Sequence, residues 1–187
     1  MAAMITLFVV LTPLAAACGN SGPANQGSPV LNVVTTNSIV ADWTERVGGE
    51  YVEVFTLLPI GKDPHTFQPG AQDIARVADA DLILSVGLGL EAGWFSKLVR
   101  NAAADSLVLV SLGETADPLE IEGAPENEGG HGHENITESA HEADDHGPLD
   151  PHFWFDPLRV KMAVSEIARR LSAVDPANDD AYRANAV

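Results

Sequence analysis

Apolar residues follow two alternating patterns along the chain between residues 30 and 110. Short apolar or β-branched runs, typical of buried strands, alternate with segments whose apolar residues recur three and four positions apart, as on one face of a helix. The runs that predict strands are Val30–Thr36, Tyr51–Leu58, Asp81–Val86 and Leu107–Val110. The segments that predict helices are Asn37–Val47, Gly70–Ala80 and Glu91–Ala103. This alternation predicts an α/β fold with a right-handed, doubly wound parallel sheet.

The strand–helix pattern is interrupted by residues 111–150. Gly, Glu, Asp, His and Pro dominate this segment, and no Lys or Arg occurs between Arg100 and Arg159. The segment is longer than the connections usual in compact domains. It is therefore predicted to be a long acidic loop, either functional or a disordered insertion.

Two helix-start signals follow the acidic segment. Asp156-Pro157 combines an N-cap residue with proline at the first helical position. The apolar stripe that continues from it consists of Val160, Ala163, Val164, Ile167, Ala168 and Leu171. Asp175-Pro176 repeats the start signal and indicates a further helix that contains Tyr182 and Asn185.

The amino-terminal residues 1–17 have the pattern of a signal peptide. They are apolar from Ile5 through Leu11 and end in three alanines directly before Cys18. The apolar run is too short to span a bilayer, and small residues before a cysteine resemble a lipobox. We expect lipidation of Cys18 and a flexible, lipid-anchored tether over residues 18–29, which would place the protein outside the cytoplasm on a membrane. Ordinary secretory cleavage near Ala17 is the alternative.

The charge of the chain narrows the classes of partner. It carries 10 Lys and Arg residues against 27 Asp and Glu residues, a formal net charge of −17. A nucleic-acid partner or a polybasic membrane patch is excluded by this balance. A cationic ligand fits it, and solubility alone would also account for it.

Two segments share the sequence Asp-Pro-His and carry the candidate chemistry. The first contains His65 and the second His152, and in each an aromatic residue and a second proline follow. Proline restricts the backbone ahead of each histidine, and both histidines come after a predicted strand, where ligands bind in open α/β sheets. A single histidine of this kind is commonly structural. A pair of pre-oriented imidazoles instead favours a zinc or manganese site. Asp63 and Asp150 are expected to be turn or cap residues, with a role as additional ligands as the alternative.

These motifs, together with Asp-Pro-Ala-Asn-x-x-x-Tyr near the end of the sequence, resemble the cluster A-I solute-binding proteins that serve zinc and manganese ABC importers. The resemblance implies a periplasmic-binding-protein fold of two α/β lobes joined by a rigid helix, with the metal between the lobes. It also implies His65 and His152 as metal ligands, and an ABC permease with its ATPase as partners. Residues 30–174 would form the amino-terminal, (βα)4-type lobe and residues 175–187 the start of the linking helix. The second lobe, with the remaining ligands, would lie outside this chain.

The acidic segment contains four further histidines: His131, His133, His141 and His146. Histidine-bearing tracts bind metal, so these side chains are candidate auxiliary ligands; a solvated linker is the alternative. Three functions remain open: an importer's binding component, a periplasmic metal buffer that acts through this segment, and a metallohydrolase. No His-Glu-x-x-His stretch and no nucleophile motif occurs, so an enzyme is not expected. The pattern leaves zinc, which affinity order favours, and manganese both open.

Overall fold

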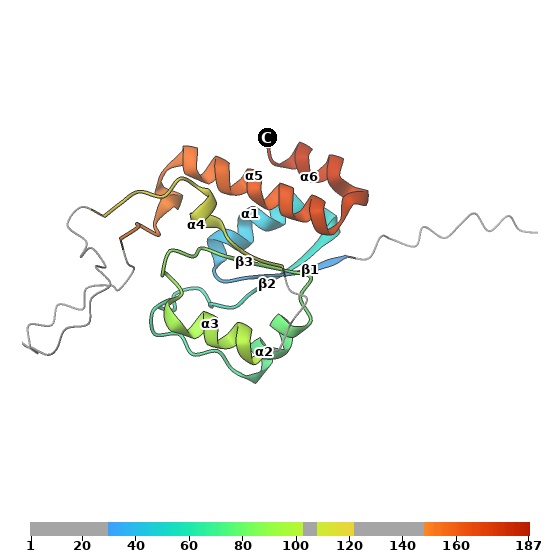
Figure 1. The fold of residues 1–187 in the computed structure, drawn as a ribbon. Helices are drawn as coiled ribbons and strands as arrows, with labels where there is room; N and C mark the ends of the chain where they lie inside the picture. Colours follow the sequence, from blue (N-terminus) through green and yellow to red (C-terminus); the bar gives the residue numbers. More distant parts are fainter. Residues whose placement is uncertain (1–29, 103–107, 122–147) are drawn as a thin grey trace, which may run out of the picture.

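A parallel β-sheet organises the protein. The computed structural model describes residues 30–102, 108–121 and 148–187, and within them the sheet has four strands in the order β2-β1-β3-β4 (Figure 1). The strands are β1 (Leu31–Thr35), β2 (Val52–Thr56), β3 (Leu82–Ser85) and β4 (Val108–Ser111). All neighbouring pairs are parallel. Because β2 lies on one side of β1 and β3 on the other, the predicted doubly wound α/β fold is confirmed.

Helices cover both faces of the sheet. One face carries α1 (Ser38–Gly48), α5 (Pro157–Val174) and α6 (Asp179–Asn185), and the other carries α2 (Ala71–Ala78) and α3 (Ala92–Asn101) (Figure 1). Successive residues of a strand pack on opposite faces of the sheet, as the two-residue period of a strand requires. Val33, Leu82 and Leu84 belong to the core under α1 and α5, whereas Val34 and Ile83 belong to the core under α2 and α3.

The two longest helices have side-chain caps, and the cap expected at Asp156 is confirmed. The Asn37 side chain accepts a hydrogen bond from the backbone N–H of Val40 at 3.0 Å, and Asp156 accepts one from Leu158 at 2.9 Å. Each bond satisfies a backbone donor that the first turn leaves without a helical partner. Pro157 occupies the first turn of α5, as its fixed φ favours.

The segment predicted as a loop over residues 111–150 has regular structure at both described ends. A short helix, α4 (Leu112–Thr115), follows β4. Further along, the backbone N–H of Ile121 donates to the Pro148 carbonyl at 2.8 Å, and that of Asp150 donates to the Leu119 carbonyl at 2.8 Å. We call this antiparallel pair of segments, 119–121 and 148–150, the neck. The sequence pattern did not indicate it, because its few paired residues are polar or isolated apolar ones.

The carboxyl-terminal motif forms a hydrogen-bonded cluster. After the 3-10 turn Pro176–Asn178, the Tyr182 hydroxyl and the Asn178 amide both donate to Oδ2 of Asp175, at 2.7 and 2.6 Å. Burial, the Asp175 hydrogen bond and the Asp175 charge all raise the pKa of the Tyr182 phenol. Asn185 extends the contact to α1 by donating to the Val47 carbonyl at 3.0 Å. The predicted helix is therefore α6, packed against α1 and α5.

Several predictions concern residues outside the described ranges. They are the signal peptide over residues 1–17, the tether over residues 18–29 with Cys18, and the auxiliary histidines His131, His133, His141 and His146. Within the described ranges, none of the helices combines the length and apolar character needed to traverse a bilayer.

Candidate metal centre

The two predicted ligands lie in connections that leave the carboxyl ends of the two outermost strands of the sheet. His65 lies in the connection from β2 to α2, and His152 lies in the connection from β4 to α5. In the strand order these are the two outer strands, with β1 and β3 between them. All four strands are parallel, so both connections emerge at the same edge of the sheet, namely the one formed by the carboxyl ends of the strands. The structure therefore brings both histidines to this edge, where β1 and β3 form the topological switch point at which α/β folds bind ligands.

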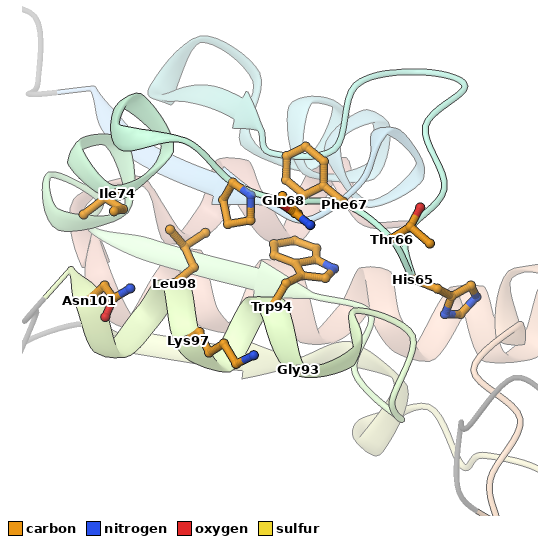
Figure 2. Close-up of a pocket in the computed structure, with 11 residues that line it drawn as sticks. His65, Thr66, Phe67, Gln68, Ile74, Gly93, Trp94, Lys97, Leu98 and Asn101 are labelled. Carbon is orange, nitrogen blue, oxygen red and sulfur yellow. The ribbon is translucent and has the colours of Figure 1, made fainter.

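The His65 turn is held by its own aspartate. Oδ1 of Asp63 accepts the backbone N–H of His65 at 2.8 Å, which closes a turn around Pro64. The imidazole is half-buried at the end of a cavity of about 610 Å³, whose apolar wall includes Phe67 and Trp94 (Figure 2).

The His152 turn has the same construction with one addition. Oδ1 of Asp150 accepts the backbone N–H of His152 at 2.9 Å and also lies 2.7 Å from its Nδ1. Metal-binding histidines commonly donate one ring N–H to a carboxylate, which orients the ring and increases its basicity. Trp154 borders the imidazole, with ring centroids 5.2 Å apart. The repeated Asp-Pro-His motif thus forms the same backbone turn twice, and both aspartates act as the turn residues that we expected.

Asp150 also connects the His152 turn to the neck. Its backbone N–H donates to Leu119, while its carboxylate holds His152. Beyond the turn, Arg159 of α5 donates to the Asp117 carbonyl at 2.7 Å and to the Asp156 carboxylate, and only 16% of its side chain is exposed. The N–H of Leu158, with Arg159, lowers the pKa of Asp156. These contacts fix both ends of the β4–α5 connection around His152.

A buried carboxylate, which the sequence analysis did not single out, lies at the switch point itself. Glu91 is 5% exposed and accepts hydrogen bonds from the Thr36 hydroxyl at 2.6 Å, the Val86 N–H at 2.7 Å and the Gly87 N–H at 3.0 Å. Burial raises the pKa of Glu91. Thr36 follows β1 and Val86 follows β3, so Glu91 joins the ends of the two central strands to the start of α3. The signal that could have indicated it is a charged residue six positions after a strand of entirely buried residues.

The donor set suits a borderline metal ion. Imidazole nitrogen binds zinc, manganese and iron. The turns described above fix the backbone of both histidines, and the Asp150 carboxylate also orients the ring of His152. Within the described ranges, His, Cys, Asp and Glu side chains do not gather in any group of three or more that could hold a metal ion. His65 and His152 would therefore supply two ligands, and the remaining positions would be taken by water or by groups beyond the described residues.

Comparison with known proteins places this arrangement in a family. The family model described as zinc-uptake complex component A, periplasmic (ZnuA) matches residues 33–187. The manganese ABC transporter substrate-binding lipoprotein PsaA of Streptococcus pneumoniae is 32% identical over 98% of this chain and 54% of its own length. The iron ABC transporter substrate-binding lipoprotein MtsA of Streptococcus pyogenes serotype M1 is 32% identical over 92% of this chain and 51% of its own length.

Solved structures agree on the fold. The Zn(II)-bound AdcA of Streptococcus pneumoniae matches with a TM-score of 0.64 and 26% identity, over 84% of this chain and 29% of that one. The chain spans about half the length of the curated relatives it matches, and the described fold corresponds to one α/β lobe. By its fold, its motifs and the family model that covers residues 33–187, the chain belongs to the ZnuA family of metal ABC transporter substrate-binding proteins.

Proposed function

We propose that this chain provides the amino-terminal half of a zinc-binding site in the extracytoplasmic binding component of an ABC importer. In this role the protein captures the ion and delivers it to a membrane permease driven by an ATPase, and no bond is broken. Residues 30–174 act as the metal-binding lobe, and residues 175–187 begin the helix that joins it to a second lobe. Lipidation of Cys18, after removal of residues 1–17, holds the protein at the membrane by the tether of residues 18–29.

The observation that carries the proposal is the repeated turn. Two Asp-Pro-His segments, 87 residues apart in sequence, adopt the same aspartate-closed turn at one edge of the sheet. A histidine that merely filled a loop would not require a matched turn on the opposite outer strand. Both turns fix the backbone of an imidazole beside the switch point, which is what capture of a small cation requires.

Zinc is the preferred ion in this proposal. Two neutral imidazoles form half of a tetrahedral zinc site, and zinc binds nitrogen ligands more tightly than manganese or iron(II) does. The relatives' names include manganese and iron, and the known structures include a zinc complex, so family membership alone does not choose the metal. The choice rests on ligand chemistry and on the histidines of the acidic segment.

A metal buffer that acts through His131, His133, His141 and His146 is the second candidate function. The observation in its favour is the density of carboxylates around those histidines in the sequence. Under this alternative His65 and His152 would be incidental to binding.

A competitive titration with zinc and manganese separates the two candidates. The chain is compared with a variant that lacks Gly123–Gly147, and the His65→Ala substitution is introduced into both. The neck makes this deletion feasible, because Ile121 and Pro148 are already hydrogen bonded at 2.8 Å. The importer role predicts that the deletion variant still binds one zinc, more tightly than manganese, and that His65→Ala abolishes this binding. Loss of nearly all zinc binding on deletion would support the buffer instead.

A further inference from the structure

Trp94 contacts the segment that carries His65 on both sides of the histidine. Its indole N–H donates to the carbonyl oxygen of Pro64, the residue directly before His65, at 2.6 Å. Its ring lies edge-on to Phe67, two residues after His65, with centroids 5.0 Å apart and planes at 81°. Figure 2 shows the indole nitrogen directed toward the segment that carries His65.

Trp94 is itself rigidly placed. It is 8% exposed within the core of α2 and α3, where it packs on Phe95 at a centroid distance of 5.7 Å. The helix that carries it begins directly after Glu91, whose carboxylate is bonded to the ends of β1 and β3. A continuous set of contacts therefore runs from the centre of the sheet through α3 to the backbone of the His65 turn.

The two histidine turns are supported by different means. At His152, the carboxylate of Asp150 contacts both the backbone N–H and Nδ1 of the ring. At His65, Asp63 closes the turn, and the Pro64 carbonyl inside this turn accepts a hydrogen bond from Trp94 of α3. The β2–α2 connection is exposed over residues 59–63, and Ile60 is 90% exposed, so this bond fixes the connection where it meets the core.

We propose that Trp94 is a positioning residue for His65. Its hydrogen bond to Pro64 and its contact with Phe67 hold the turn, so that the imidazole is already placed when the ion arrives and less conformational freedom is lost on binding. Side chains that orient metal ligands without touching the metal typically change affinity 10- to 100-fold when they are replaced. This inference rests on the proposed function, because it assigns His65 as a ligand.

The test compares three variants of the full chain. Trp94→Phe retains an aromatic ring but removes the N–H donor. Val77→Ala is the matched control, since it removes apolar volume from the same core, on α2, and leaves the ring and the N–H donor of Trp94 unchanged. His65→Ala defines the binding that depends on His65. Zinc affinity is measured against a chromophoric chelator, and amide hydrogen exchange at His65 is measured in the metal-free protein.

A positioning role predicts that Trp94→Phe weakens the His65-dependent zinc binding about 10-fold and accelerates exchange of the His65 amide. Val77→Ala should do neither, even if both variants unfold at a similar lower temperature. If Trp94→Phe does not fold, the benzothiophene analogue of tryptophan at position 94 preserves the bicyclic shape without the N–H and should give the same two effects.

Two results would overturn the inference, and they are distinguishable. If His65→Ala lowers zinc affinity while Trp94→Phe matches Val77→Ala in both measurements, Trp94 is only a core residue and the proposed function stands. If His65→Ala leaves zinc affinity unchanged, His65 is not a ligand, and the proposed function fails together with the role of Trp94.

Discussion

The carboxylate of Asp150 lies 2.7 Å from Nδ1 of His152 and accepts the backbone N–H of the same residue at 2.9 Å. One side chain thus fixes both the turn and the ring of a proposed metal ligand. Asp63, in the equivalent position of the first motif, holds the backbone of His65 at 2.8 Å. The matched pair allows the contribution of the ring contact to be separated from that of the turn.

Replacing Asp150 by Asn should weaken zinc binding about 10-fold, because the amide can still close the turn but no longer offers a charged partner to the ring. Asp63→Asn preserves its turn in the same way and should have a smaller effect. Zinc affinity of the two variants, measured in the chain that lacks Gly123–Gly147, checks this difference. Equal losses in both variants would mean that the ring contact of Asp150 adds nothing to the turn.

Arg159 should contribute to stability far more than an exposed arginine does. Arg159→Met retains the apolar stem but removes the donors to Asp117 and Asp156, and we expect a loss of about 2 kcal/mol in the free energy of unfolding. Arg46→Met is the control, since Arg46 pairs with Asp42 on an exposed helix surface, where solvent screens the pair, and this substitution should change stability much less. Urea denaturation measures both. Similar small effects would show that the contacts of Arg159 do not stabilise the β4–α5 connection.

Tyr182→Phe should also destabilise the fold. The hydroxyl is inside the cluster at the end of α5 and donates to Asp175 at 2.7 Å, so its removal costs a charge-assisted hydrogen bond, about 2 kcal/mol. Thermal or urea unfolding checks this value. An unchanged free energy of unfolding would indicate that Asn178, the other donor to Oδ2 of Asp175, fully compensates.

Glu91 should make stability depend on pH. Burial raises the pKa of this carboxyl above its ordinary value of 4.5. A group with a raised folded-state pKa contributes stability that is complete below its unfolded pKa and is lost as pH rises through the folded pKa. Wild type should therefore lose stability relative to Glu91→Gln as pH rises above 4.5 and through the raised folded-state pKa. The hydrogen bonds that the glutamine changes add an offset that does not vary with pH.

Urea unfolding of both proteins across this range measures the difference. A constant gap between wild type and Glu91→Gln would contradict the raised pKa.

Most of the sheet could be predicted from the sequence because its signals are local. The apolar run over residues 81–86 became β3, whose four residues are all buried, and Asp156 caps the helix whose start it indicated. Boundaries shifted where the regular strand ended before the apolar pattern did. Leu57 and Leu58, for example, lie beyond β2, although their N–H groups still bond to Thr35 and Thr36.

The supports of the site could not be predicted, because they join residues far apart in sequence. Trp94 and Pro64 are 30 positions apart, and Glu91 bonds to Thr36 across 55 positions. No periodicity relates such pairs; only the parallel order of the strands brings them together. The Asp-Pro-His turns were predictable because each is complete within four residues.

Zinc K-edge X-ray absorption of the chain that lacks Gly123–Gly147, loaded with one equivalent of zinc, tests the central claim most directly. His65 and His152 are the only histidines left in that sequence, so imidazole scattering can arise from no other residues. We predict a spectrum that fits two imidazoles per zinc, with the imidazole signal lost in the His65→Ala, His152→Ala double variant. A spectrum that shows zinc bound only by oxygen, with no imidazole signal, would contradict the assignment of His65 and His152 as the ligands of this lobe.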